Sequence, residues 1–461
     1  LVAIPMEMLR DEAASSEDLN GMYWHHGKRM LQVARRIRSL GDLPVIVFSS
    51  FGCGPDAFIM HMLRRELGSV PTLELEIDEH SEVNGVHTRV EAFRWALGTP
   101  REAPPRAPEA PGAATRRDLE GRRLQLPWMS DHAVAVAAAF RSCGVDASVL
   151  PPPDEASIAL GREALDGGEC LPCSFILGDM LRCLENGAQG SDRASAFFMI
   201  TGDGPCRLGQ YPWLHRAVLD TRGFADVPIF NASQDPEFYR HFAVVPSEFQ
   251  RRAWGGVVAT DLLHRKYRSM RSRARERAAV DRAYQIGLGN LERALENGTR
   301  PDAALVGAFD RLEAELTDEP VPAVTIAVLG ENYIRCNAVA NAGLAEELER
   351  LGAEVWFPSL CEWVMYTNWT ARLHCRYERQ PRRMLELLAD VEPLDPKVAP
   401  VDEVVRQVER VAKGQPAPVA WHPLLERIGQ AVEAAAAKKT KAVQSLLSRI
   451  ELLRNNSITA H

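Results

Sequence analysis

Four cysteines of this chain lie in loops that are rich in glycine and proline. Cys53 lies in the motif FGCGP, Cys170 and Cys173 form the motif CLPC, and Cys206 lies in the motif GPC. Cysteine thiolates bind zinc and iron–sulfur clusters. Glycine lets the backbone approach a bulky inorganic group, and proline stiffens the loop around it. The residue types therefore predict a metal or cluster site on these four cysteines.

The spacing of the four cysteines leaves several chemistries open. Four thiolates are the usual ligands of a [4Fe–4S] cluster, which the pattern favours. A Cys-x-x-Cys pair is also typical of a redox dithiol or of half a structural zinc site, and unrelated buried thiols are a fourth alternative. We interpret the other five cysteines as structural: Cys143, Cys183, Cys336, Cys361 and Cys375.

Each cysteine loop is expected to lead into a helix. An apolar run at 44–50 predicts a buried strand before Cys53, and a helix is expected from Asp56 to Leu67. Residues 196–201 predict a strand before Cys206, with a helix at 208–221. Helix N-termini favour thiolates, and ligands of open α/β sheets bind at the carboxyl ends of strands. We therefore expect the three loops to converge.

Strands that alternate with helices predict the fold class. Further strands are expected at 72–77, 123–127, 147–150, 324–329 and 353–357, and further helices at 20–40, 133–143, 250–316 and 337–351. We predict an α/β protein with several Rossmann-like parallel-sheet units, helices on both faces of each sheet, and a helical C-terminal region.

The chain is expected to divide into six segments. Proline and alanine dominate 99–115, which is typical of an extended linker, and 421–454 is helical by composition. The segments are an α/β unit with the first cysteine loop (1–98), a linker or insertion (99–120), an α/β domain with the CxxC and GPC loops (121–250), a helical connector (251–320), an α/β unit (321–400) and a helical C-terminal region (401–461).

Polar residues near these loops could act on a substrate or on a cluster. Glu79 and His80 follow an expected strand, where they could do acid–base chemistry or form a hydrogen-bonded loop before the next helix. Arg207 and Gln210 follow Cys206 on its helix. They could donate to cluster sulfurs or to a bound anion, or be ordinary first-turn residues.

The composition of the chain bears on which kinds of partner it could bind. The chain has 461 residues, 46% of them hydrophobic, and a formal net charge of -8. No broad basic excess indicates nucleic-acid binding, and no apolar stretch reaches the length of about 18 residues that predicts a membrane span. Nine cysteines, an odd number in a large chain, indicate free thiols in a reducing compartment, so we expect the cytoplasm.

Seven stretches resemble a known family. They are SFGCGPDAFI, LELEIDEHSEVNGVHTRVEAF, GGECLPCSFILGDML, GPCRLGQYPWL, QLPWMSDHA, IAVLGENYIRCNAVAN and LGAEVWFPSLCEW. Together they are similar to the superfamily of 2-hydroxyacyl-CoA dehydratases and CoA-enzyme activases. The closest branch is the large activase proteins, whose C-terminal part is similar to a dehydratase subunit. The resemblance covers most of positions 1–370.

The resemblance implies a function and its partners. In that superfamily an ATP-hydrolysing activase delivers a low-potential electron to a cluster-bearing partner, which dehydrates a 2-hydroxyacyl-CoA or reduces small molecules. This chain is similar to the partner, so the resemblance implies a reductase or dehydratase component that binds a [4Fe–4S] cluster. The implied ligands are Cys53, Cys170, Cys173 and Cys206. An activase and an acyl-CoA or small-molecule substrate are the implied partners, and homo- or hetero-oligomers stay open.

Two departures from the family pattern bear on mechanism. Four protein ligands leave no open iron for substrate, which would suit a pure electron carrier, whereas three would leave one iron free. The segment 421–454 contains no cysteine, although relatives carry a further cysteine motif near their C-terminus. A non-catalytic scaffold with structural zinc remains the alternative of a different class.

Overall fold

The structure is a computed structural model that describes residues 3–377, except 10–18, 20–21, 42, 51, 53, 79, 98–115, 186, 188–193, 203, 234–244, 275 and 316–323. The expected linker at 99–115 and the expected helical segment 421–454 lie outside the described residues. The chain divides into two compact units, Leu1–Leu360 and Cys361–His461. Each unit is described by itself, and in the second the described part belongs to helix α15 (Leu360–Tyr377).

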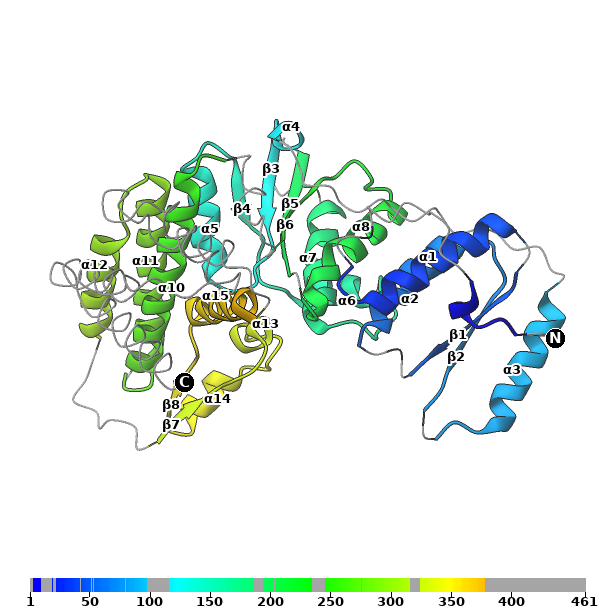
Figure 1. The fold of residues 1–461 in the computed structure, drawn as a ribbon. Coiled ribbons are helices and arrows are strands. Elements are labelled where there is room, and N and C mark those ends of the chain that lie inside the picture. The colour runs from blue at the N-terminus through cyan, green and yellow to red at the C-terminus, as the bar shows by residue number, and fades with distance from the viewer. Residues whose placement is uncertain are drawn as a thin grey trace, which may run out of the picture. The chain divides into compact units, whose positions relative to one another are not determined.

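A four-stranded parallel sheet forms the centre of the first unit (Figure 1). Its strands are β3 (Arg122–Leu126), β4 (Ala147–Val149), β5 (Ala194–Thr201) and β6 (Ile229–Ser233), in the order β4-β3-β5-β6. Every neighbouring pair is parallel. The carboxyl ends of these strands therefore lie at one edge of the sheet, where the loop of Cys206 begins.

Both faces of this sheet are covered by helices, as the sequence predicts. Successive side chains of a strand point to opposite faces. Accordingly, Phe197 and Met199 of β5 pack in one apolar cluster, whereas Ala196 and Phe198 pack in another. The first cluster contains residues of α7 (Leu171–Glu185) and α8 (Tyr211–Thr221), and the second contains residues of α5 (His132–Arg141) (Figure 1).

Two smaller parallel sheets complete the predicted α/β pattern. Strands β1 (Val45–Ser49) and β2 (Thr72–Glu76) pair in one, and β7 (Val324–Ala327) and β8 (Ala353–Trp356) pair in the other. The helices of these parts are α1 (His25–Leu40), α2 (Asp56–Leu67), α3 (Val83–Ala96), α13 (Asn332–Cys336) and α14 (Leu344–Arg350). The α2 bounds match the expected 56–67.

The remaining helices complete the described part of the first unit. They are η1 (Met6–Met8), α4 (Arg116–Leu119), α6 (Glu155–Glu163), η3 (Arg207–Gln210), α10 (Glu248–Arg271), α11 (Arg277–Glu296) and α12 (Asp302–Glu313). Helices α10 and α11 pack against α5, and α12 packs against both. The expected helical region 250–316 is therefore three helices that form a layer outside α5.

The expected helix at 337–351 is wrong in its first half. Residue Asn337 ends α13 instead, because its side chain accepts hydrogen bonds from the backbone N–H groups of Val339 and Ala340 at 3.0 and 3.1 Å. Ala342 and Gly343 then adopt positive φ angles of 55° and 69°. This conformation interrupts a right-handed helix, so α14 begins only at Leu344.

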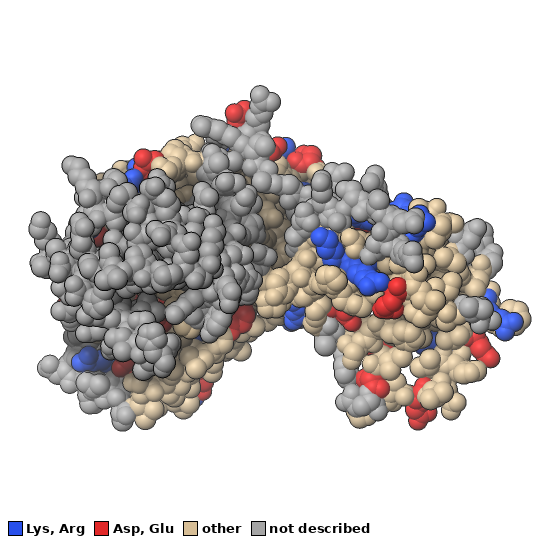
Figure 2. Space-filling model, viewed as in Figure 1, with Lys and Arg blue, Asp and Glu red and all other residues tan. Residues whose placement is uncertain are grey.

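Charged side chains are mixed in sign on the visible surface. In the view of Figure 2, Lys and Arg lie close to Asp and Glu among the described residues. Opposite charges also pair in the interior, where Arg268 and Arg271 of α10 both bind the buried carboxylate of Glu349. Among the described residues no helix is long and apolar enough to cross a membrane.

Helices α6 and α7 approach so closely that two glycines are required at the crossing. A Cβ atom on Gly161 would overlap the carbonyl oxygen of Ser174, and one on Gly178 would overlap that of Ser157. The helix N-terminus that carries the CxxC pair is thus held against α6 by backbone-to-backbone contact. Asp154 caps α6 by accepting from the Ser157 N–H at 3.0 Å.

Replacing Gly178 with alanine is expected to destabilise the protein. The added methyl group has no space at the crossing, and overpacking a tight contact costs about 1–3 kcal/mol. The matched control is Gly289→Ala on α11, where no atom lies within 4 Å of an added Cβ. That change should stabilise the helix by about 0.5–1 kcal/mol. Urea unfolding of both variants measures the difference, and equal stabilities would contradict the described crossing.

Candidate metal centre

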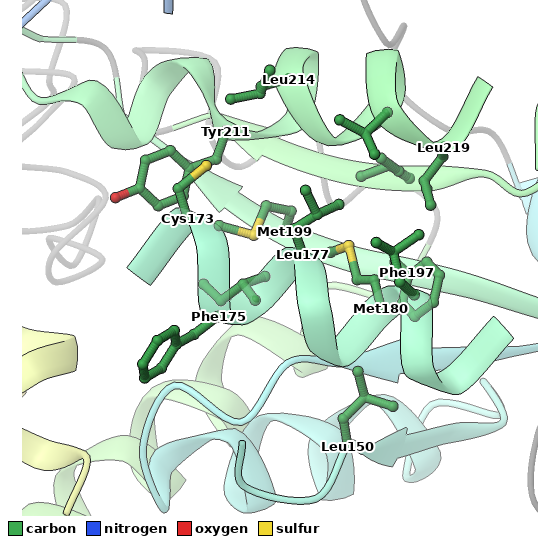
Figure 3. Packing of buried hydrophobic residues seen from close by; sticks show 14 of the residues in the cluster. Leu150, Cys173, Phe175, Leu177, Met180, Phe197, Met199, Tyr211, Leu214 and Leu219 are labelled. Carbon is green, nitrogen blue, oxygen red and sulfur yellow. The ribbon is translucent and has the colours of Figure 1, made fainter. Parts of the chain in front are cut away.

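The CxxC pair lies at the start of α7, and its two thiols differ in exposure. Cys170 precedes the helix and accepts a backbone hydrogen bond from Ser174 at 3.2 Å, as an N-terminal residue does. Cys173 is fully buried, whereas Cys170 is half-buried. Figure 3 shows the Cys173 side chain beside the Tyr211 ring, at the end of the apolar cluster that covers the sheet. Cys170 thus precedes α7 and Cys173 lies in its first turn, where the helix dipole is positive.

Cys206, the third predicted ligand that the structure describes, follows β5 at the carboxyl edge of the sheet. Cys206 precedes the short helix η3, which continues into α8, and its thiol is exposed. Its loop is closed by a backbone approach, since a Cβ on Gly209 would overlap the carbonyl oxygen of Gly202. The predicted order of strand, cysteine loop and helix is confirmed here, with the 3-10 turn as an addition.

Arg207 links the GPC loop to the other two cysteine loops. Its Nη1 atom donates to the carbonyl oxygens of Gly54 and Gly168, both at 3.3 Å. The guanidinium also lies over the Phe58 ring, 5.8 Å from the centroid. One side chain therefore holds residues that neighbour Cys53, Cys170 and Cys206.

The first two loops also touch each other directly. A Cβ on Gly168 would lie 2.5 Å from the Gly52 carbonyl oxygen, so only glycine fits there. Gly52 and Gly54 have positive φ angles of 52° and 63°, which also favour glycine. Cys53 itself lies outside the described residues. The two glycines on either side of it nonetheless place its loop against the loop of the CxxC pair.

A partly buried acid–base pair, Glu169 and His61, anchors the CxxC loop to α2. The Glu169 carboxylate binds His61 Nε2 and accepts from the Gly167 N–H at 2.9 Å. Burial alone would raise the pKa of Glu169, but the hydrogen bonds from His61 and the backbone outweigh it and lower that pKa. Arg64, one turn further along α2, binds Asp166 of the same loop and Glu74 of β2. Helix α2, which follows the first cysteine loop, thus positions the second.

Helix α8 presents two hydrogen-bonding side chains to the CxxC pair. His215 Nε2 lies 3.4 Å from Cys173 Sγ and 3.1 Å from the Cys173 carbonyl oxygen. The Tyr211 hydroxyl bonds with Cys170. Sequence reasoning missed both residues. Their spacing of four places them on one helical face, which is the signal that could have identified them.

The thiols of Cys173, Cys170 and Cys206 all influence the pKa of Tyr211. Burial raises the pKa of this phenol, and negative charge on Cys173, Cys170 and Cys206 raises it further. Burial likewise raises the pKa of the Cys173 thiol well above its usual value, with Cys170 and Glu169 adding to the shift and Arg207 opposing it. A metal ion would replace the proton on such a thiol, because it compensates the charge of the thiolate.

The structure also describes Gln210 and His80, two further residues that were predicted to belong to a site. Gln210 is buried and ends η3, so it does not lie on the surface. His80 is exposed, and its backbone N–H donates to Asp78 Oδ1 at 2.8 Å, within a turn that Ser81 also joins. Glu79 lies outside the described residues. Because β1 and β2 are parallel, this turn lies at the same sheet edge as the first cysteine loop.

The structure describes three of the four predicted ligands, Cys170, Cys173 and Cys206. Among them, no group of three or more His, Cys, Asp and Glu is spaced to hold a metal ion. Cys170, Cys173 and Cys206 each influence the pKa of Tyr211, and glycine is required at the contact between the first two loops. A comparison with family models, with curated proteins and with solved structures found no match.

A buried carboxyl group lies two turns after Cys173 on α7. The Asp179 residue is only 6% exposed, and its Oδ2 atom has no hydrogen-bond partner among the described residues. Burial raises its pKa from 3.8 to about 7, against smaller opposing effects of Ser157 and Arg182. Folding therefore keeps a proton on Asp179 over a pH range in which the unfolded chain releases it.

Replacing Arg207 with methionine is expected to loosen the three loops even without metal. Hydrogen bonds from a charged donor contribute about 1.5–3 kcal/mol each at most, and partial exposure reduces this, so we expect a loss of about 1–2 kcal/mol. Urea unfolding of the metal-free, reduced protein measures it. Arg162→Met, at an exposed position of α6, is the control. If the two variants were equally stable, Arg207 would not hold the loops together.

Replacing Asp179 with asparagine is expected to change how stability depends on pH. The raised pKa means that wild-type stability is full below about 3.8 and is lost as pH rises to about 7. Asparagine cannot ionise, so the variant should gain stability relative to wild type across this range, by a few kcal/mol at most (about 1.4 per pKa unit). Thermal unfolding at pH 5 and 8 measures it, with the exposed Asp310→Asn as control. A constant difference would contradict the burial of a protonated carboxyl group.

Proposed function

We propose that this chain binds a [4Fe–4S] cluster on Cys53, Cys170, Cys173 and Cys206 and accepts low-potential electrons from an ATP-dependent activase. The observation that carries the proposal is the contact of Arg207 with the carbonyl oxygens of Gly54 and Gly168. It joins three loops that are far apart in the sequence and that each contain cysteine. Neither buried unrelated thiols nor an isolated redox pair requires this convergence.

The roles of the chain's own residues follow from the site. A bound cluster would supply one-electron transfer. The first turn of α7 and the N–H groups of η3 would stabilise its negative charge, while Arg207 adds a positive charge next to it. The apolar wall of Tyr211, Phe58 and the α7 side chains excludes water from one side of the site. Exposed Cys206 marks the side from which a partner or substrate would approach.

The family resemblance extends the proposal to reaction and partner. We propose a reductase or dehydratase component, with an acyl-CoA or another small molecule as substrate, that works in a reducing cytoplasm where thiols stay free. The number of protein ligands decides between two modes. Three thiolates would leave one iron open for substrate, whereas four would suit electron transfer alone. Exposed Cys206 is the described cysteine best placed to be the labile ligand.

Metal and sulfide analysis of the anaerobically purified chain tests the proposal. We expect a brown protein with about four iron and four sulfide per chain, as the cluster type requires. Cys170→Ala and Cys173→Ala should lose colour and iron. The matched control is Cys143→Ala, a half-buried cysteine just beyond α5, which should retain both. A colourless protein with stoichiometric zinc would overturn the proposal in favour of a structural zinc scaffold.

Turnover experiments separate electron carriers from enzymes. With activase, ATP and a reductant present, consumption of a 2-hydroxyacyl-CoA would identify a dehydratase. Re-oxidation of the reduced chain by an added acceptor, without consumption of any acyl-CoA, would instead identify an electron carrier. Cys53→Ala and Cys206→Ser should differ from Cys173→Ala by retaining a cluster if either residue is the labile ligand.

A further inference from the structure

The two hydrogen-bonding side chains of α8 are spaced along the chain much as the two cysteines of the CxxC pair are. Tyr211 and His215 are four residues apart, with ring centroids 5.9 Å apart, and each lies against one of the two cysteines at the start of α7. Residues three or four apart on a helix share one face. Two adjacent helices thus present, at one level, two sulfurs and two side chains that can donate hydrogen bonds.

The proton on His215 can be assigned from its contacts. The His215 ring is fully buried, and a neutral imidazole carries a single proton, on either Nδ1 or Nε2. Nε2 lies 3.1 Å from the Cys173 carbonyl oxygen, which can only accept a hydrogen bond. The proton is therefore on Nε2. Nδ1 has no hydrogen-bond partner among the described residues, in agreement with this tautomer.

The same N–H group also faces the sulfur. Cys173 Sγ lies 3.4 Å from Nε2, so the N–H is shared between the carbonyl oxygen and the sulfur. The Tyr211 hydroxyl can donate as well, as any neutral phenol can, and its partner is Cys170. Both donors are buried, as is the Cys173 sulfur, so water competes little for these hydrogen bonds and the local dielectric constant is low.

We infer that Tyr211 and His215 are tuning residues that donate hydrogen bonds to the ligand sulfurs of Cys170 and Cys173 and thereby raise the reduction potential of the metal centre. This inference rests on the proposed cluster. Reduction adds negative charge that is shared with the ligand sulfurs, and a donor to a sulfur stabilises the reduced state more than the oxidised one. The resulting potential determines which electron donor can reduce the site.

Anaerobic redox titration of the purified full chain tests the inference. Tyr211→Phe removes only the hydroxyl, and His215→Phe removes the N–H while keeping a ring in the cavity. Both variants should retain iron and sulfide, and their midpoint potentials, followed by EPR or visible absorbance, should shift to more negative values. His215→Gln, which can place an N–H near the same position, should restore part of the shift.

A buried tyrosine elsewhere in the same apolar cluster serves as the control. Tyr333 packs against Phe175 with ring centroids 6.5 Å apart, and Tyr333→Phe should leave the potential unchanged. A wild-type chain without iron and sulfide would overturn the proposed function and this inference with it. Clusters of full occupancy with equal potentials in wild type, Tyr211→Phe and His215→Phe would overturn the inference alone. If His215→Phe does not fold, Tyr211→Phe decides the question.

Discussion

The contacts made by the Arg207 guanidinium are the constraint on which the candidate site depends. Three loops that start at positions near 52, 168 and 204 could each take many conformations, since glycine and proline dominate them. Two carbonyl oxygens, from Gly54 and Gly168, bond the same Nη1 atom, and a Cβ on Gly168 would crowd the Gly52 carbonyl oxygen. A planar charged group that bonds both carbonyl oxygens therefore restricts the conformations of the loops and brings the cysteine segments together.

Burial and charge have opposite effects on the Cys173 sulfur, and the proposed metal would change their balance. Cys173 lies in an apolar cluster where a free thiolate is costly, so its proton is held tightly in the absence of metal. The start of α7, Arg207 and the donors of α8 all favour negative charge on sulfur. In the proposed site, the positive charge of a bound metal would compensate the charge of the thiolates. The apolar side chains and the hydrogen-bond donors around it would affect its electronic properties.

Much of the fold could be predicted because a strand that is buried on both faces of a parallel sheet is a continuous apolar run in the sequence. The apolar run of β5 is covered on both faces, and the run before Asp56 ends where a helix can begin. The helix expected at 337–351 failed because the Asn337 side chain competes for backbone N–H groups, which apolar periodicity does not report. Strand β6 was missed because Asn231 and Ser233 dilute its apolar pattern.

By itself the sequence determined the chemistry: which thiols lie in glycine-rich loops, that helices follow them, and that the sheets are parallel. These properties are local, since they depend on residue type and on periods of two or about 3.6 residues. Only the tertiary structure decided that Arg207 joins the loops, that His61 of α2 anchors Glu169, and that α8 directs Tyr211 and His215 at the CxxC pair. Such contacts join residues tens to hundreds of positions apart, and helix packing, rather than any pattern along the chain, determines them.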